Sequence, residues 1–96
     1  GCFLYATKAG KLLMIWSSFC NGEYAVGIAE SVTGRITGPW IQQPDMLFSA
    51  NGGHGMIFRS FEGKLYIVLH GPNTPSGAER ARMFELVDVG NTLKIK

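Results

Sequence analysis

Two histidines are the side chains of this chain best suited to chemistry near neutral pH, where an imidazole can transfer a proton or bind a metal. His54 lies in the glycine-rich run from Asn51 to Gly55, where residues without side chains let other groups approach the backbone closely. The pattern leaves two interpretations open, a functional histidine and an ordinary loop histidine at the start of a strand. His70 ends an apolar segment before Gly71, and a structural or rim position explains it better than ligand contact.

Arg80 and Arg82 lie in the last pair of predicted strands and form a second group of candidate site residues. Side chains alternate between the two faces of a strand, so Arg80, Arg82 and Phe84 share one face. Alternation therefore does not choose between the two arginines, and we favour Arg80. The alternative is that they form surface ion pairs with Glu79 or Glu85.

The acidic residues do not have the placement of a catalytic pair. Glu30 comes late in the third predicted strand, away from the edge where the other candidates lie. Four other acids fall in predicted turns or loops, where a solvated charge is the simpler explanation: Glu23, Glu62, Asp45 and Asp88. We therefore predict no catalytic residue within this chain.

Composition narrows the classes of protein and ligand. Cys2 and Cys20 are the two cysteines; they are compatible with a disulfide or with two buried thiols, and no partners of zinc-site type lie near them. The net charge of +2, with no basic run, argues against a nucleic-acid partner. No apolar stretch approaches the roughly 20 residues that a membrane helix needs, which argues against a membrane partner.

These candidates must be positioned by strands, because short apolar runs separated by glycine-containing turns fill the chain. Glycine interrupts every stretch long enough for a helix, so we predict an all-β fold. The predicted strands are Phe3–Thr7, Leu12–Trp16, Tyr24–Ala29, Trp40–Gln42, Met56–Ser60, Leu65–Leu69, Arg82–Val87 and Thr92–Ile95.

An internal repeat organises these strands. The segment Phe3–Ser18 aligns without gaps with Met56–Gly71, an offset of 53 residues, and Gly10-Lys11-Leu12 falls on Gly63-Lys64-Leu65. A period of about 50 residues is typical of four-stranded propeller blades. We predict one blade over about residues 1–50 and the next blade with the closing strands over about 51–96.

Two blades cannot close a ring, and each would leave an apolar face in water. The sequence therefore predicts either a longer parent protein, whose remaining blades cover these faces, or self-association of this chain.

Several motifs then carry a resemblance to a known family. GKLLMIWSSF is followed in order by YAVGIAES, GRITGPW, GGHGMIF, GKLYIVLHGPN and ERARMFEL. Together they resemble the last two blades of glycoside hydrolase family 43, the arabinanases, arabinofuranosidases and β-xylosidases that act on plant cell-wall polysaccharides. The similarity covers essentially the whole chain and implies the C-terminal part of a five-bladed β-propeller.

The resemblance also implies roles for residues. In the family, two aspartates and a glutamate project into the central funnel, where one carboxyl protonates the leaving oxygen and another activates water. The aspartates belong to earlier blades and the glutamate would lie just before Gly1, although Cys2 stands where the family usually has proline. His54 matches a histidine that holds a central water or a cation such as calcium; no cofactor is required. An arginine at the place of Arg80 or Arg82 binds sugar hydroxyls and restrains a carboxylate's charge.

The resulting prediction is part of a glycosidase that cleaves arabinosyl or xylosyl linkages by inversion, outside the cell or in the periplasm, and that is inactive as the isolated chain. Its partners would be a carbohydrate and the remaining blades. The alternative is a non-catalytic carbohydrate-binding or oligomer-forming β-domain, in which aromatic residues such as Trp40 carry the affinity. For Trp16 and Tyr66, which lie in apolar strands, core packing is the simpler role.

Overall fold

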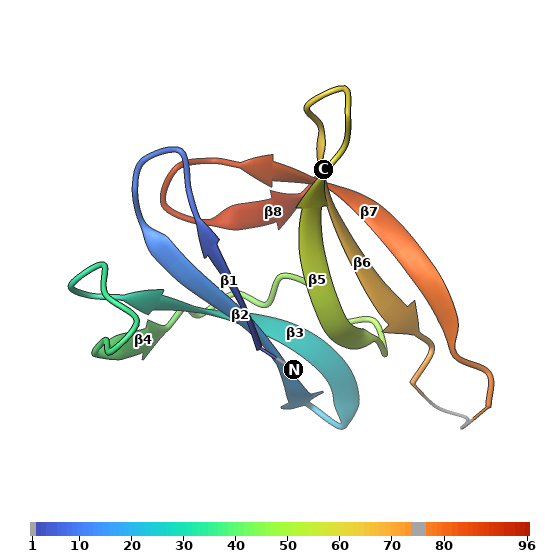
Figure 1. Cartoon of the computed structure of the whole chain (residues 1–96). Helices are drawn as coiled ribbons and strands as arrows, with labels where there is room; N and C mark the ends of the chain where they lie inside the picture. Colours follow the sequence, from blue (N-terminus) through green and yellow to red (C-terminus); the bar gives the residue numbers. More distant parts are fainter. Residues whose placement is uncertain (1, 74–76) are drawn as a thin grey trace.

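Eight strands make up the regular structure of residues 2–73 and 77–96, which the computed structural model describes (Figure 1). They are β1 (Cys2–Ala6), β2 (Leu12–Cys20), β3 (Glu23–Ser31), β4 (Trp40–Gln42), β5 (Gly53–Arg59), β6 (Leu65–Gly71), β7 (Arg80–Asp88) and β8 (Leu93–Ile95). No helix occurs in these two ranges, so the all-β prediction is confirmed. Over the same residues, no helical segment has the length and apolar character needed to span a bilayer.

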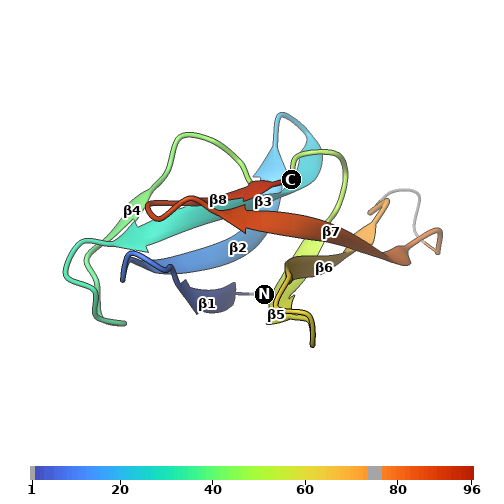
Figure 2. The ribbon, with the colours of Figure 1, turned by 90° about the horizontal axis from the view of Figure 1, so that it is seen from above.

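The strands form two antiparallel sheets, each a simple up-and-down meander. The first sheet has the order β1-β2-β3-β4 and the second has the order β5-β6-β7-β8. The first strands of both sheets, β1 and β5, lie on the same side of the molecule (Figure 2), and β5 also contacts β2 and β3. Two consecutive four-stranded sheets arranged in this way are two propeller blades.

The internal repeat is confirmed by the pairing of the strands. Phe3 pairs with Ile15 in the first sheet, and Met56 pairs with Val68 in the second, so both members of the pair move by 53 residues. The hydrogen bonds that close the β1–β2 and β5–β6 turns follow the same offset. The two hairpins are therefore the same structural unit used twice.

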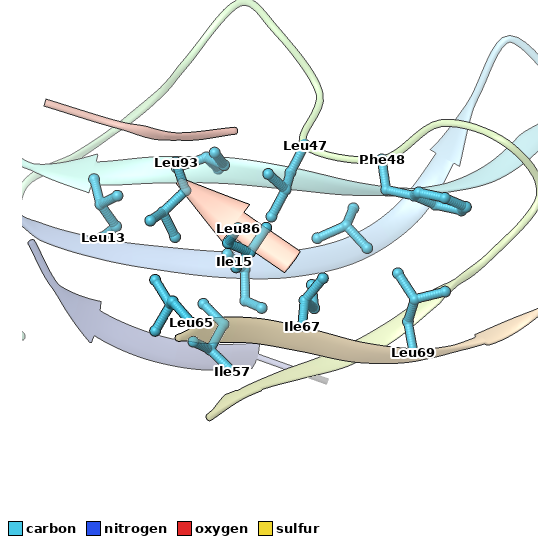
Figure 3. Packing of buried hydrophobic residues seen from close by; sticks show 12 residues of the cluster. Leu13, Ile15, Leu47, Phe48, Ile57, Leu65, Ile67, Leu69, Leu86 and Leu93 are labelled. Atoms are coloured by element: carbon cyan, nitrogen blue, oxygen red, sulfur yellow. The ribbon is translucent and has the colours of Figure 1, made fainter. Parts of the chain in front are cut away.

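The hydrophobic core lies between the two sheets (Figure 3). The first sheet and the segment after it contribute Leu13, Ile15, Val26, Ile28, Leu47 and Phe48; the second contributes Ile57, Leu65, Ile67, Leu69, Leu86 and Leu93. Alternation along the strands sends the neighbours of these residues to the outer face of each sheet. Both outer faces carry exposed apolar side chains, among them Leu4 and Trp16 on the first sheet and Met56, Phe58 and Met83 on the second.

The two cysteines are free thiols. Cys2 pairs across the β1–β2 ladder with Trp16, four residues before Cys20, so the two thiols lie far apart along β2. The disulfide within one chain does not form, and the other interpretation, two buried thiols, is also wrong, because Cys2 is exposed and Cys20 is partly exposed.

Candidate functional site

The predicted site residues gather at one end of the molecule, where β5 begins, β6 ends and β7 begins (lower end of Figure 1). His54 is the second residue of β5, His70 is the next-to-last residue of β6, and Arg80 opens β7. Gly1, which the resemblance places beside the family's acid, lies outside the described residues.

His54 has an unusual backbone. Its φ angle is +57°, in the left-handed region that residues with a side chain seldom adopt, although histidine does so more often than most. The pairing of β5 with β6 also shifts between Gly53 and Met56, so β5 has a bulge at this point. Bulges redirect a side chain and are common beside functional sites. The exposed imidazole of His54 is thus set apart from the regular alternation of β5.

The glycines around His54 allow close packing of the backbone. A Cβ atom on Gly52 would lie 2.6 Å from the His70 carbonyl oxygen, and one on Gly53 would lie 2.8 Å from the Tyr24 ring. A side chain at either position would collide with its neighbour. The glycine-rich run therefore holds the start of β5 tightly against β6 and the first sheet.

The first sheet helps to fix the position of His54. The backbone N–H of His54 donates a hydrogen bond of 2.7 Å to Ser17 Oγ on β2. Tyr24 on β3 stacks on the His70 ring, with 5.4 Å between the ring centroids. Neither Ser17 nor Tyr24 was a candidate from the sequence, because Ser17 directly follows one predicted strand and Tyr24 opens the next, and the pattern gives neither side chain a role in a site.

His70 lies close to His54. Their ring centroids are 6.4 Å apart, and His70 Nε2 is 3.0 Å from Asn73 Oδ1. With Tyr24 on one side and Asn73 at its ring nitrogen, His70 has partners that fix its orientation. The structure thus combines the structural role expected for His70 with a place beside the candidate site.

The two arginines differ in position. Arg80 lines a shallow cavity of about 300 Å³, together with His54, Met56, Val68, Leu69, His70, Glu79 and Ala81. Arg82 does not line it; its guanidinium carbon lies 5.1 Å from the centre of the Phe84 ring. Arg80 donates a hydrogen bond to the Glu79 carbonyl oxygen, and in the described ranges neither arginine forms an ion pair with a carboxylate.

Glu79 is the carboxylate of this cavity, and its electrostatics do not suit an acid catalyst. Hydrogen bonds from its own backbone N–H and from that of Gly77 hold the pKa of the Glu79 carboxyl below its usual range, assisted by His70. A general acid at neutral pH needs a raised pKa instead. Inverting hydrolysis also needs a second carboxyl, and the cavity lining contains none.

Two other partnered acids lie at the opposite end of the sheets. Glu30 forms an ion pair of 2.7 Å with Lys11, which lowers the pKa of the Glu30 carboxyl. Asp88 accepts hydrogen bonds from the Tyr5 hydroxyl and the Lys8 N–H beyond the end of β1. Both side chains are therefore used to join strands and sheets.

The described part of the chain holds no group of three or more histidine, cysteine, aspartate or glutamate residues that could bind a metal ion. His54 offers one imidazole, whereas calcium is normally surrounded by six to eight oxygen atoms. The residues described here do not by themselves fit a calcium site.

The aromatic residues of the alternative function have internal partners. The indole N–H of Trp16 donates to Gln42 Oε1 at 2.7 Å, and that of Trp40 donates to the Ile36 carbonyl oxygen at 2.9 Å. Tyr66 stacks on Phe58. These rings are thus held by contacts within the fold.

Comparison with solved structures shows which proteins this chain is similar to. Over 91% of its length the chain superposes on an endo-arabinase from Bacteroides thetaiotaomicron VPI-5482, with a TM-score of 0.82 and 42% sequence identity. The chain is similar in sequence and structure to family-43 glycoside hydrolases. A thermostable family-43 glycoside hydrolase matches the whole chain with a TM-score of 0.83 and 26% identity. No protein-family model and no curated protein sequence matches it.

The family-43 resemblance inferred from the sequence motifs is therefore confirmed, as is the propeller-blade fold. The chain spans 31% of the endo-arabinase and 34% of the thermostable enzyme. It corresponds to about a third of each solved structure.

Proposed function

We propose that this chain is part of a glycosidase that cleaves arabinosyl or xylosyl linkages in plant-type polysaccharides, and that its catalytic carboxylates lie outside the chain. The observation that carries the proposal is the 42% identity to an endo-arabinase over 91% of the chain. Because that solved structure is an endo-arabinase, an arabinosyl substrate is the first to test.

The described residues support a binding and positioning role. His54, His70 and Arg80 border one cavity at the end of the second sheet. Imidazole nitrogens and a guanidinium supply hydrogen-bond partners for sugar hydroxyls. In the proposed enzyme, His54 and Arg80 orient the sugar, or a water beside it, against carboxyls from other blades.

The carboxyl requirement sets the rest of the mechanism. Hydrolysis with inversion uses two carboxyls about 6.5–9.5 Å apart, one to protonate the leaving oxygen and one to activate water. No such pair lines the cavity. The proposal therefore assigns both groups to the remaining blades and predicts that the isolated chain is inactive.

Two further points belong to the proposal. A cation near His54 would take one imidazole nitrogen from this chain and its other ligands from water or other blades. By its resemblance to family-43 enzymes, the parent enzyme would work outside the cell or in the periplasm.

The experiment is an activity assay on the full-length protein beside the 96-residue chain. Aryl α-L-arabinofuranoside, aryl β-D-xyloside and debranched arabinan are the substrates, and NMR of the first product anomer reports inversion or retention. Turnover by the full-length protein alone, with an inverted first product, is the expected result. A folded full-length protein without turnover on any substrate would reject the glycosidase and favour a carbohydrate-binding β-domain.

A further inference from the structure

The internal repeat relates the outer faces of the molecule to the interface between its two sheets. The first sheet packs on the second through a row of Phe3, Ile15 and Ile28, one from each of β1, β2 and β3. By the repeat, the corresponding row of the second sheet is Met56, Val68 and Met83. That row does not face the core: Met56 is 57% exposed and Met83 is 58% exposed.

The same relation holds in the opposite direction. The second sheet packs against the first through Ile57, Ile67 and Phe84, which pair across β5, β6 and β7. The corresponding row of the first sheet consists of Leu4, Met14 and Ala29, on its outer face. Each outer face thus repeats one half of an interface that the chain already forms.

We propose that copies of this chain associate head to tail, with the outer face of the second sheet of one copy on the outer face of the first sheet of the next. The new contact continues the sheet-on-sheet interface within each chain. The proposal concerns the chain alone and does not depend on the proposed glycosidase activity. In a longer parent protein, the same two faces would be covered by its other blades.

Charge and polarity agree with this contact. The row Met56–Val68–Met83 and the row Leu4–Met14–Ala29 contain no charged residue, so the rows themselves bury no charge. Arg80 and Glu79 lie beside Met56 and Val68 at the end of the second sheet, at the edge of the contact. On the same face of the second sheet, Glu85 is already paired with Lys96 at 3.2 Å. Leu4, Met56 and Met83 are the exposed members of the two rows, and adjoining exposed apolar residues mark an interaction surface.

The two faces differ from each other, so the contact is heterologous, and such contacts either close into a ring or continue as a filament. Two-bladed copies can close only rings with an even number of blades. In a five-bladed ring, each blade is rotated by about 72° from the one before it. Of the rings with an even number of blades, the six-bladed one has the rotation closest to this, about 60° per blade. The expected closed form is therefore a trimer of about 31.5 kDa, three times the 10.5 kDa of one chain.

The test blocks one face at a time in the 96-residue chain. Met83→Glu places a charge on the outer face of the second sheet, and Leu4→Glu places one on that of the first. Phe61→Glu is the matched control, because Phe61 is fully exposed in the β5–β6 turn, away from both faces. Light scattering after size exclusion measures mass, and circular dichroism checks the fold.

The expected result is an oligomer for the wild type and the Phe61→Glu control, and a monomer for each blocked variant alone. An equimolar mixture of the two blocked variants should form a heterodimer of about 21 kDa, twice the mass of one chain, because one unblocked face of each kind remains. A monomeric, folded wild type would overturn the proposal without any variant. Dimers of either blocked variant alone would also overturn it, because they would show that like faces pair.

Discussion

The backbone of His54 gives a sharp prediction about stability. Its φ of +57° should make glycine more stable than alanine at this position, the reverse of the usual order in a strand. A left-handed residue with a Cβ atom carries about 1–2 kcal/mol of strain. Glycine removes that strain but loses about 0.4–1 kcal/mol through the greater freedom of its unfolded chain. The free energy of unfolding of His54→Gly should therefore exceed that of His54→Ala by about 1 kcal/mol.

Thermal unfolding at one fixed protein concentration measures this difference. For a domain of this size, about 1 kcal/mol corresponds to roughly 4–8 °C in Tm. The control is the same pair of substitutions at Ser18, an exposed mid-strand position in β2 that is not among the residues with positive φ. There, glycine should be less stable than alanine by about 0.5–1 kcal/mol. Equal stability of the two His54 variants, or a more stable alanine variant, would refute the strained backbone.

Three further predictions concern packing and charge. Ile67→Ala should cost about 2–5 kcal/mol by urea unfolding, because the side chain is fully buried; a loss below about 1 kcal/mol would contradict the core. Gly52→Ala should cost about 1–3 kcal/mol, measured as a drop in Tm, because the new Cβ would lie 2.6 Å from the His70 carbonyl oxygen; an unchanged Tm would contradict that contact. Burial raises the pKa of the Asp88 carboxyl, but hydrogen bonds from the Gly90 N–H, the Lys8 N–H and the Tyr5 hydroxyl outweigh this and lower it. The ionised carboxylate therefore stabilises the folded state above the unfolded pKa of about 3.9, and this stabilisation is lost as pH falls through the folded pKa. Unfolding free energies between neutral pH and about pH 3 should therefore fall more steeply for the wild type than for Asp88→Asn, and parallel profiles would contradict this role.

Much of the fold could be predicted because apolar runs and turn glycines recur with a fixed offset. The repeat placed Phe3–Ser18 on Met56–Gly71, and the strand pairs follow that offset. Strand ends were less predictable. β2 continues to Cys20 and β3 begins at Glu23, beyond the apolar runs, because Asn21 and Gly22 form a two-residue turn with positive φ at both positions.

The candidate site was less accessible from the sequence, because its geometry depends on contacts between blades. The glycines around His54 indicated close packing, but the pattern could not show the bulge in β5 or the Ser17 hydroxyl that holds the His54 backbone. Alternation put Arg80 and Arg82 on one face and could not choose between them. Arg80 is the first residue of β7, at the end of the sheet, and it lines the cavity, whereas Arg82 does not.

The most direct test of the central claim is the catalytic efficiency of the full-length protein with His54→Ala. If His54 positions the sugar or its water, kcat/KM on aryl α-L-arabinofuranoside should fall by about a hundredfold or more. Phe61→Ala, at the opposite end of the β5–β6 hairpin, should leave kcat/KM unchanged. A His54→Ala protein that folds and retains the wild-type kcat/KM would contradict the claim that this chain supplies a residue to the catalytic centre.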